Sequence, residues 1–479
     1  MFNELKSRIV SSPPAPRGLP ALPSGWRYER LRSVAELRVS GVDKLTLDDE
    51  SPVRLCNYTD VYKNDYIVDK PGYMSATASR AEIARFRLEQ DDVVITKDSE
   101  TWNDIAVPAY VVDAAHDFVC AYHLAIVRPR RSLLRGSYLH HALREPRIAN
   151  QFHVAASGVT RFGLTQDAIK SVQVPVPPMD EQAAIVKYLG HAHARIDRAI
   201  AAKRKLIALL EEQKQAIIHQ AVTRGLDPSV PLKDSGTPWL GKIPAHWEVC
   251  RAKYLFKEFD IRSGTGSERL LSLRAIAGLV FHDEVSERLI GPEVLTKYKK
   301  VRPGHLVMNR MRAASGLFAI AATEGLVSPD YSTMEVSEAV DARYYLRLFK
   351  TRAAMAEFRQ QSSGLGTGES GFMRLYSERF GRIPLSMPPP AEQEAISGNL
   401  ATVEQEVNEI TIRATREVEL LREFRTRLTS DVVTGQVDVR EIAAALPEFT
   451  GEVLVAADDE FGDDGELVES ELEFAGADE

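Results

Sequence analysis

The sequence predicts an α+β protein in which two mixed α/β domains are separated by two long antiparallel coiled-coil helices, with a pseudo-twofold internal repeat. The repeat is seen in a Pro-Pro-x-x-Glu-Gln-x-x-Ile motif, which occupies residues 177–185 and again residues 388–396. The same offset of 211 positions relates Val222-Thr223 to Val433-Thr434, more than 40 residues further on, so it indicates a duplicated unit. Apolar residues at heptad spacing follow each motif and predict a long coiled-coil helix.

The composition is typical of a globular protein. The chain has 479 residues, 44% of them hydrophobic and 27% charged, which is enough for roughly two to four domains. It has no apolar run long enough for a membrane span and begins without the apolar segment of a signal peptide, so we expect a cytoplasmic protein. The cysteines, Cys56, Cys120 and Cys250, are scattered and odd in number, which favours neither a disulfide framework nor a zinc site.

Charge is distributed unevenly along the chain. Residues 1–440 carry 60 basic and 54 acidic side chains, whereas residues 441–479 carry 14 acidic side chains and no Lys or Arg. A mildly basic body is compatible with nucleic-acid binding but does not by itself indicate it. We expect the Pro-rich residues 1–23 to form a disordered arm and the acidic residues 436–479 to form a disordered tail.

The first α/β domain is predicted at residues 24–178. Its short β-branched runs at residues 93–96, 109–112 and 121–127 are typical of strands, residues 137–143 are typical of a helix, and residues 172–176 lead into the first Pro-Pro pair. Proline fits the start of a helix, and acidic residues in the first turn complement its dipole. The first long helix is therefore placed at residues 179–224, before Gly225.

The second half of the chain repeats this order. A linker at residues 225–244, rich in Pro, Gly and Asp, precedes a second α/β domain at residues 245–388. We expect strands at residues 306–308, 317–321 and 334–336, and a single helix at residues 342–361. The second long helix is placed at residues 389–435.

Each long helix carries ten heptad positions that we expect to face the other helix. The first seam is Ile185, Leu189, Ala192, Ile196, Ala199, Lys203, Leu206, Leu210, Gln213 and Ile217, and the second is Ile396, Leu400, Val403, Val407, Ile410, Ala414, Glu417, Leu421, Phe424 and Leu428. The charged members, Lys203 and Glu417, meet in an antiparallel pair if facing positions sum to about 620, and polar pairs of this kind set the register of coiled coils.

Taken together, these features resemble the specificity subunit of type I restriction-modification enzymes. The resemblance covers about residues 23–435. It rests on the two Pro-Pro-x-x-Glu-Gln motifs, each of which begins a heptad helix after an α/β domain. It rests also on the Asp-Ser-Gly-Thr-Pro-Trp-Leu-Gly segment at residues 234–241 before Trp247, and on Gly-Leu-Val-Ser-Pro-Asp-Tyr at residues 325–331.

The resemblance implies a function. Each α/β domain is implied to be a target recognition domain that reads one half of a split sequence in double-stranded DNA, and because the two domains differ, the target is expected to be asymmetric. The helices are implied to be conserved spacers that carry two methyltransferase (modification) subunits, which two motor-nuclease (restriction) subunits join. The chain itself is implied to be non-catalytic and without a cofactor or metal, while S-adenosylmethionine, ATP and Mg²⁺ belong to the partner subunits.

Candidate DNA contacts in the second domain lie on a predicted strand-loop-strand segment. They are Lys299, Lys300, Asn309, Arg310 and Arg312. Arginine can form a fork with guanine and asparagine with adenine in the major groove. The alternative is that Asn309 and Arg310 make structural hydrogen bonds.

In the first domain the corresponding loop contributes Lys97, Ser99, Thr101 and Asn103, for which the alternative is a solvated hairpin turn. A Gly-rich polar segment precedes each Pro-Pro pair, at residues 157–163 and 362–370. Glycine allows the backbone to approach closely, and Ser, Thr and Arg can hold phosphates. Thr160, Arg161 and Arg374 are therefore further candidates, with a flexible connection to the helix as the alternative reading.

Two other classes of function remain as alternatives. A complete methyltransferase or nuclease requires catalytic motifs, and the three partial matches are poor. Ala15 follows Pro14 where a methyltransferase has an aromatic residue, Ile243 stands where a phosphate-binding loop needs Ser or Thr, and Glu212-Gln213-Lys214 lies inside a heptad helix. A structural coiled-coil adaptor without DNA specificity does not need two divergent domains with basic loops. A recognition module that acts only with a methyltransferase is a further variant.

Overall fold

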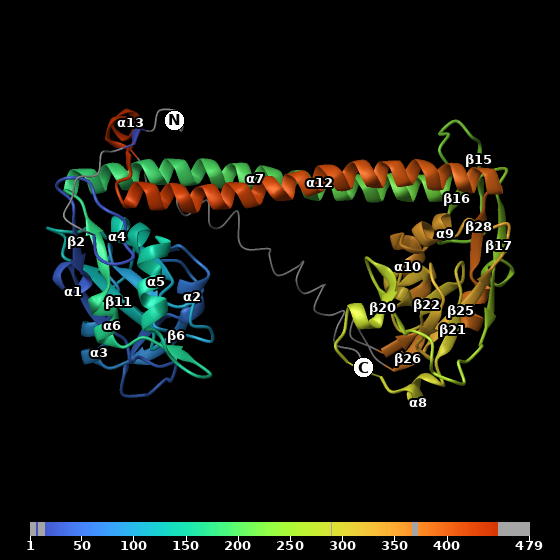
Figure 1. Ribbon diagram of the computed structural model, residues 1–479, viewed down its shortest axis with the longest axis horizontal. Coiled ribbons are helices and arrows are strands. Elements are labelled where there is room, and N and C mark those ends of the chain that lie inside the picture. Colours follow the sequence, from blue (N-terminus) through green and yellow to red (C-terminus); the bar gives the residue numbers. More distant parts are fainter. Residues whose placement is uncertain (1–5, 8–14, 289, 366–371, 449–479) are drawn as a thin grey trace. The chain divides into compact units, whose positions relative to one another are not determined.

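A computed structural model describes residues 6–7, 15–288, 290–365 and 372–448. The described chain forms two compact units. Unit 1 contains the residues up to Arg204 and those from Thr415 onward, and unit 2 contains Lys205–Ala414. The long helices α7 (Met179–Arg224) and α12 (Pro390–Val433) each contribute one half to either unit (Figure 1). The fold is α+β with an internal repeat, as the sequence predicts.

Within unit 1 the two long helices pack antiparallel. His193 Nε2 lies 2.9 Å from Thr429 Oγ1, and the Lys203 ammonium lies 2.6 Å from the Glu417 carboxylate, so rising numbers on α7 face falling numbers on α12. The predicted contact of Lys203 with Glu417 is confirmed. Their side chains are 37% and 52% exposed, so this pair lies at the surface of the coil.

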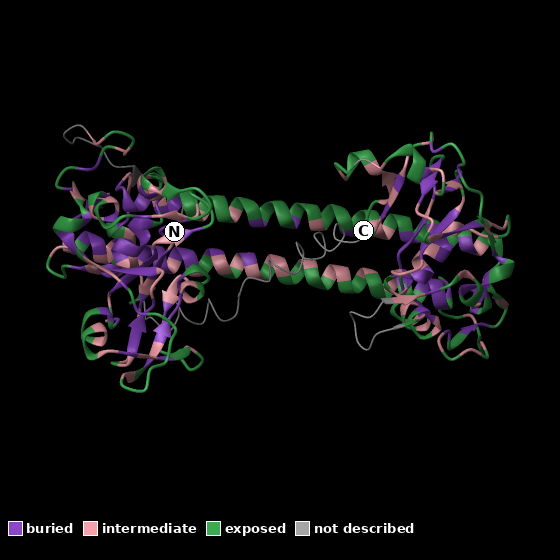
Figure 2. Cartoon of the chain, turned by 90° about the horizontal axis from the view of Figure 1, so that it is seen from below, coloured by how far each residue is buried: buried purple, intermediate pink, exposed green. Residues whose placement is uncertain are grey.

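The heptad seam is most completely buried where the helices pack against a globular part, although Ala414 in the middle of α12 is also buried. Ile185 and Leu189 are fully enclosed in unit 1, and Ile396 and Leu400 are fully enclosed in unit 2. Further along the helices Leu206, Ile410 and Phe424 are about 40% exposed (Figure 2). Two helices cover a seam from one side only, so the middle of the coil keeps apolar surface in contact with solvent.

The globular part of unit 1 is built on a five-stranded sheet. Its order is β3 (Ala35–Val39), β11 (Leu124–Pro129), β7 (Val93–Thr96), β9 (Pro108–Val111) and β5 (Tyr66–Ile67). The helix α4 (Gly136–Leu143) has almost all of its residues buried. A second sheet joins β4 (Ser51–Cys56), β6 (Met74–Ala78) and β10 (Phe118–Cys120). The strand predicted from residue 121 starts at Leu124, because residues 121–123 form a turn closed by the Leu124 amide on the Ala121 carbonyl.

Unit 2 is built on a four-stranded sheet around an aromatic core. The sheet order is β18 (Phe256–Phe259), β25 (Tyr331–Val336), β22 (Leu306–Asn309) and β23 (Phe318–Ile320). The single helix predicted at residues 342–361 is wrong. The chain forms α9 (Ala342–Phe349) and α10 (Arg352–Gln361), and the side chain of Thr351 caps α10 by accepting from the Ala354 amide.

The repeated Glu-Gln pair ties each long helix to its own domain. Glu181 accepts a hydrogen bond from the Trp26 indole at 3.1 Å, and Glu392 accepts one from Trp247 at 3.0 Å. The buried Gln182 amide accepts from the Arg135 backbone and donates to the Leu133 and Pro177 carbonyls. The buried Gln393 amide makes the same three bonds, with Asp341, Ala339 and Pro388. The motif therefore recurs because both domains need the same anchor.

The end of each long helix is held by the other domain. Tyr138, in the first domain, donates its hydroxyl to the Val433 carbonyl of α12 at 2.9 Å. Tyr344, in the second domain, donates to the Val222 carbonyl of α7 at 2.7 Å. This exchange explains why the sequence offset of 211 persists to Val222 and Val433.

The expected disorder of residues 1–23 and 436–479 is wrong for the parts that the structure describes. Leu22 is buried, and Gln436 donates a side-chain hydrogen bond to the Ala21 carbonyl. The strand β1 (Lys6–Ser7) pairs with β29 (Val437–Asp438), and α13 (Arg440–Ala445) follows. Residues 1–5, 8–14 and 449–479 lie outside the described residues.

The predicted linker also has regular structure. Its strands β15 (Leu232–Asp234) and β16 (Lys242–Pro244) form a hairpin, and Ile243 is fully buried. The linker before Trp247 and the arm before Trp26 thus occupy equivalent places in the two units: Gly225 packs beside Trp247, and Gly435 packs beside Trp26.

Candidate nucleic-acid interface

In unit 1 a small sheet brings the two predicted DNA-contact segments together. The strand β8 (Asp98–Ser99) pairs with β13 (Phe162–Gly163), which pairs in turn with β12 (Ser157–Gly158). Ser99 faces Phe162 in this register, and Asp98 faces Gly163. The loop that contains Lys97 and the hairpin that contains Arg161 are therefore one site.

Asp98 is the centre of this site. Its carboxylate lies 2.9 Å from the Arg161 guanidinium, 2.8 Å from His123 Nδ1 and 3.5 Å from the Lys97 ammonium. One carboxylate thus faces two permanent cations and an imidazole. The Arg161 side chain is 55% exposed, so its guanidinium can contact an external anion while its ion pair with Asp98 holds it in position.

The other predicted residues of unit 1 divide into exposed and buried groups. Thr101, Asn103 and Thr160 are exposed beside the sheet. Val159, at the tip of the β12–β13 hairpin, is 94% exposed. Ser99 is buried, and its hydroxyl accepts from the Thr101 amide at 3.4 Å, which matches the alternative of a hairpin turn.

Sequence reasoning missed the aromatic and imidazole groups at this site. The rings of His123 and Tyr122 are tilted against each other with centroids 3.7 Å apart, and Tyr58 stacks on Tyr62 at 5.5 Å. Tyr62 donates its hydroxyl to Asp104 of the predicted loop at 2.6 Å. No pattern in the sequence links His123 to Asp98, because a turn and two strands bring them together. Trp102, within the predicted loop itself, is half exposed.

In unit 2 the corresponding cluster surrounds Asp330. The hairpin of β26 (Ser363–Leu365) and β27 (Phe372–Arg374) leads to Leu375, whose amide donates to the Arg310 carbonyl at 2.8 Å. Arg374 then lies 3.5 Å from the Asp330 carboxylate. As in unit 1, the loop after a central strand and the segment before the long helix meet at one acid.

Asn309 and Arg310 make the structural hydrogen bonds given as the alternative. The Asn309 side-chain oxygen accepts from the amides of Met311 and Arg312, which closes the loop after β22. The Arg310 guanidinium donates to the Pro329 and Asp330 carbonyls at 2.6 Å each. These two residues hold the loop in shape, and Arg312 follows on it.

Lys299 and Lys300 lie on β21 (Lys299–Val301), outside the loop that carries Asn309, Arg310 and Arg312. Lys299 is 3% exposed, its ammonium donates to the Tyr331 carbonyl at 2.8 Å, and burial lowers its pKa. This position argues against a DNA contact by Lys299 and gives it a structural role. Lys300 bonds to Glu268 at 2.5 Å, and this hydrogen bond lowers the pKa of Glu268 to about 2.

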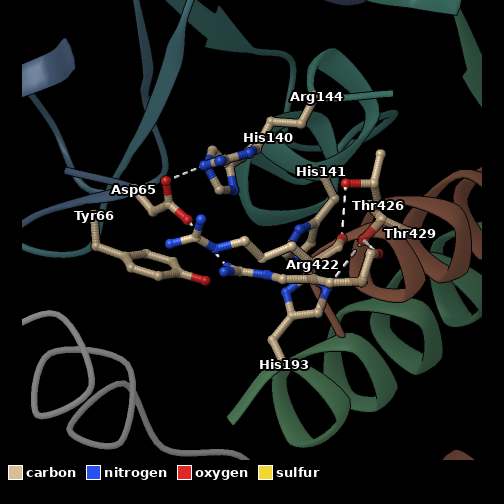
Figure 3. A pocket seen from close by; sticks show the side chains of 10 residues that line it. Asp65, Tyr66, His140, His141, Arg144, His193, Arg422, Thr426 and Thr429 are labelled. Atoms are coloured by element: carbon tan, nitrogen blue, oxygen red, sulfur yellow. Dashed lines mark hydrogen bonds and ion pairs between the residues drawn. The ribbon is translucent and has the colours of Figure 1, made fainter. Parts of the chain in front are cut away.

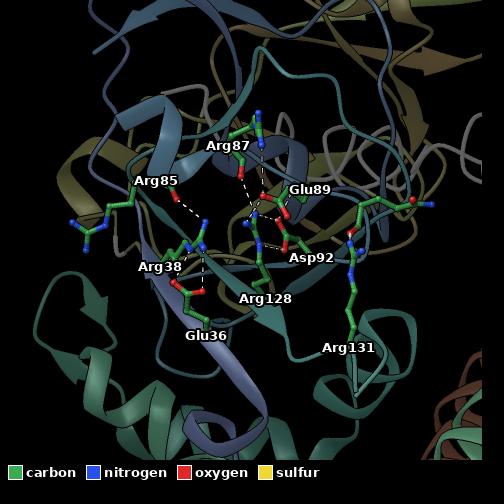
Figure 4. Close-up of polar contacts among 9 residues, drawn as sticks. Glu36, Arg38, Arg85, Arg87, Glu89, Asp92, Arg128 and Arg131 are labelled. Carbon is green, nitrogen blue, oxygen red and sulfur yellow. Dashed lines mark hydrogen bonds and ion pairs between the residues drawn. The ribbon is translucent and has the colours of Figure 1, made fainter. Parts of the chain in front are cut away.

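Another group of arginines in unit 1 is engaged internally. Arg128 on β11 donates to the buried Asp92 and to Glu89 at 2.6–2.7 Å (Figure 4). On the neighbouring strand β3, Arg38 forms a bidentate ion pair with Glu36 of the same strand. In these contacts the positive charges of Arg128 and Arg38 are balanced by acidic side chains of the same sheet and its loops.

Comparison with known proteins agrees with this arrangement. Residues 23–212 match the family model described as the type I restriction modification DNA specificity domain. The chain is 23% identical over 429 residues to the putative type I restriction enzyme MjaX specificity subunit of Methanocaldococcus jannaschii, which covers 88% of this chain and 95% of that protein. Residues 23–212 therefore resemble a type I restriction modification DNA specificity domain, and most of the chain is similar to a protein described as a type I specificity subunit.

Further matches extend over most of each matched protein, and two solved structures share the fold. The MjaVIII specificity subunit of the same organism is 22% identical over 65% of this chain and 73% of its own. The crystal structure of the HsdS subunit from Thermoanaerobacter tengcongensis matches with a TM-score of 0.52 at 16% identity, over 87% of this chain and 98% of that one. A chain from a structure that describes complex assembly and conformational transition of the type I R-M system matches with a TM-score of 0.61 at 15% identity, over 87% and 100% of the two chains.

Within the described residues, no helix combines the length and the apolar character that crossing a membrane requires. The same part of the chain contains no group of three or more His, Cys, Asp or Glu side chains arranged to hold a metal ion.

Proposed function

We propose that this chain is a DNA specificity subunit of a type I restriction-modification system and reads a bipartite, asymmetric target in double-stranded DNA, with one half-site for each unit. The observation that carries the proposal is the construction of the two clusters. In each unit the loop after a central strand and the segment before the long helix meet at one carboxylate, Asp98 or Asp330, beside an arginine from the second segment. The side chains around the two acids differ, so the half-sites differ.

The proposed contacts follow from exposure and charge. In unit 1, Arg161, Thr101, Asn103 and Thr160 are exposed around Asp98 and Lys97 is partly exposed. These five are assigned to bases or phosphates, with Ser99 shaping the turn. In unit 2, Arg312 and Arg374 take this role, Lys300 contributes at a greater distance, and Asn309 and Arg310 position the loop. Phosphate contacts fix register, while base-edge contacts supply specificity.

The specificity subunit is proposed to be non-catalytic and to act within a complex in the cytoplasm. Two methyltransferase subunits and two motor-nuclease subunits are its proposed partners, and these hold S-adenosylmethionine, ATP and Mg²⁺. Apolar side chains left exposed along the helices, among them Leu209, Ile412 and Leu420, support a docking role for the coil. We further propose that the helices set the half-site separation.

The test is sequence-dependent DNA binding by the subunit reconstituted with its methyltransferase subunits. The target is first obtained by methylation-sensitive sequencing of the source genome. Arg161→Gln is expected to weaken binding of the target by about 1–3 kcal/mol. The control is Arg27→Gln, because Arg27 is equally exposed and pairs only locally with Glu29. Equal loss in both variants contradicts the proposed site, and equal binding of target and unrelated DNA contradicts the proposed function and favours a structural adaptor.

A further inference from the structure

A cavity of about 200 Å³ lies in unit 1 where the first domain meets both long helices (Figure 3). Its wall combines Asp65 of the domain, His140 and Arg144 from α4 and its end, His193 of α7, and Arg422 and Arg425 of α12. None of these residues belongs to the cluster around Asp98. The cavity is therefore separate from the proposed DNA-reading site.

Positive charge exceeds negative charge around this cavity. Three guanidinium groups line it, but Asp65 is the one carboxylate among the described lining residues. Arg144 and Arg425 both pair with Asp65, and Arg425 also reaches Asp197 at 3.2 Å. Burial is the largest single influence on Asp65 and opposes its ionisation, but the positive groups around it, with Arg144 and Arg425 among them, together outweigh burial and hold the pKa of Asp65 below its usual value. Arg422 is exposed and, within the described part of the chain, forms no ion pair.

A buried donor also faces the cavity without a partner. His140 is 2% exposed, and its Nε2 atom makes no hydrogen bond with the residues that the structure describes. A buried polar nitrogen without a partner is costly in a folded protein and needs an explanation. Burial lowers the pKa of His140, so its imidazole is neutral and can donate an N–H to an anion without carrying a charge itself. Thr429, held by His193 at 2.9 Å, adds a hydroxyl to the wall.

We propose that this cavity binds a phosphate group. Arginine forks match phosphate oxygens and bind them by charge-assisted hydrogen bonds. A dianionic tetrahedral group can accept from Arg422, from His140 and from the other arginines together. The volume is below the ~300–1,000 Å³ typical of sites for whole drug-sized molecules, so the ligand is a single phosphate group rather than an enclosed nucleotide. The proposal is independent of the DNA-reading function proposed above.

Such a phosphate can come from two sources, free inorganic phosphate or the backbone of DNA. The first experiment titrates inorganic phosphate into the full chain, followed by ³¹P NMR, with chloride holding the ionic strength constant. Arg422→Gln is expected to weaken phosphate binding about tenfold, the usual effect of one charge-assisted contact. Arg427→Gln is the matched control, because Arg427 lies five residues further on the same helix and its side chain is 84% exposed. It is expected to bind phosphate as the unaltered chain does.

The second experiment adds a short DNA duplex to the phosphate-loaded chain. Release of the phosphate from the unaltered chain identifies DNA backbone as the competing source, and retention identifies free phosphate as the ligand; both outcomes support the cavity. The proposal is overturned if the unaltered chain does not bind phosphate in preference to chloride. It is also overturned if Arg422→Gln and Arg427→Gln lose phosphate affinity equally. Both altered positions are exposed, so melting temperatures close to that of the unaltered chain are expected and show that the fold is kept.

Discussion

Gln182 and Gln393 show how a single side chain makes a repeated motif necessary. Each amide is fully buried, accepts one backbone N–H and donates to two backbone carbonyls of the loop beside the helix start. Only a side chain with both a donor and an acceptor at this reach can satisfy all three groups. Glu in the preceding position serves the indole of the first tryptophan of the domain in the same way.

Replacement of either glutamine by leucine leaves three buried backbone groups without partners. Gln182→Leu is expected to lower the free energy of unfolding of unit 1 by about 2–4 kcal/mol, and Gln393→Leu to do the same for unit 2. Chemical denaturation monitored by circular dichroism measures both changes. Gln405→Leu, at an exposed position of α12, is the control and should stay within about 0.5 kcal/mol. A small effect of all three changes contradicts the anchoring role.

At the level of elements, Lys203 and Glu417 define the register of the two helices but contribute little stability. Both side chains are at least one third exposed, and exposed ion pairs are typically worth 0.2–1 kcal/mol. Lys203→Glu or Glu417→Lys alone is therefore expected to cost about 0.5–1 kcal/mol, and the double exchange to recover most of it. A double-mutant cycle from thermal melts measures the coupling. A coupling above about 3 kcal/mol indicates a buried pair and contradicts this view.

The packing of α4 against both long helices makes unit 1 sensitive to acid. His140, His141 and His193 lie with neighbouring ring centroids 5.2 Å and 5.4 Å apart. Burial lowers the pKa of all three, for His141 to about 3, while Asp65, Arg144 and Arg425 around them stay charged. The unfolded chain binds more protons than the folded chain below the ordinary histidine pKa, so the stability of unit 1 falls as the pH falls below about 6.5.

The slope of this decline tests the argument. Each of the three imidazoles contributes at most about 1.4 kcal/mol per pH unit. In thermal melts between pH 7.5 and 5, the stability of His141→Gln is expected to depend on pH less steeply than that of the unaltered chain, by the contribution of one imidazole. His116→Gln, at an exposed position, should keep the full slope. If His141→Gln melts with the pH dependence of the unaltered chain, the buried imidazole is not the group that titrates.

Sequence patterns predict elements whose cause is local. The run at residues 93–96 and the two long helices were predictable because apolar spacing and the proline start act within a few turns. The break at Thr351 was not, because threonine caps a helix or lies within one according to its tertiary surroundings. The sites divide in the same way. The segments that carry Arg161 and Arg374 were predictable by composition, whereas His123, and the burial of Lys299, depend on strand pairing between distant residues.

For the whole molecule, the exchange of helix ends makes each unit depend on both halves of the chain. Unit 1 combines residues before Arg204 with residues after Thr415, and its hydrophobic core includes Val433, Val439 and Ala443. Unit 2 is closed by the end of α7 and by the hairpin of the linker. The ends of the chain therefore do for unit 1 what the internal linker does for unit 2.

This equivalence predicts opposite results for two truncations. Removal of residues 449–479 deletes a segment with 12 acidic side chains beyond the described residues and is expected to leave both units unchanged. Removal of residues 436–479 also deletes β29 and α13, the buried Val439 and Ala443, and the hydrogen bond from the Gln436 side chain to the Ala21 carbonyl. It is expected to destabilise unit 1 by about 3 kcal/mol, the value of one buried valine and one methyl group, and to leave unit 2 unaffected.

Hydrogen exchange followed by mass spectrometry localises the change: peptides around Trp26 should lose protection while those around Trp247 keep it. Loss of protection in both units shows that they fold as one, and loss in neither shows that the C-terminal helix is not part of the core of unit 1.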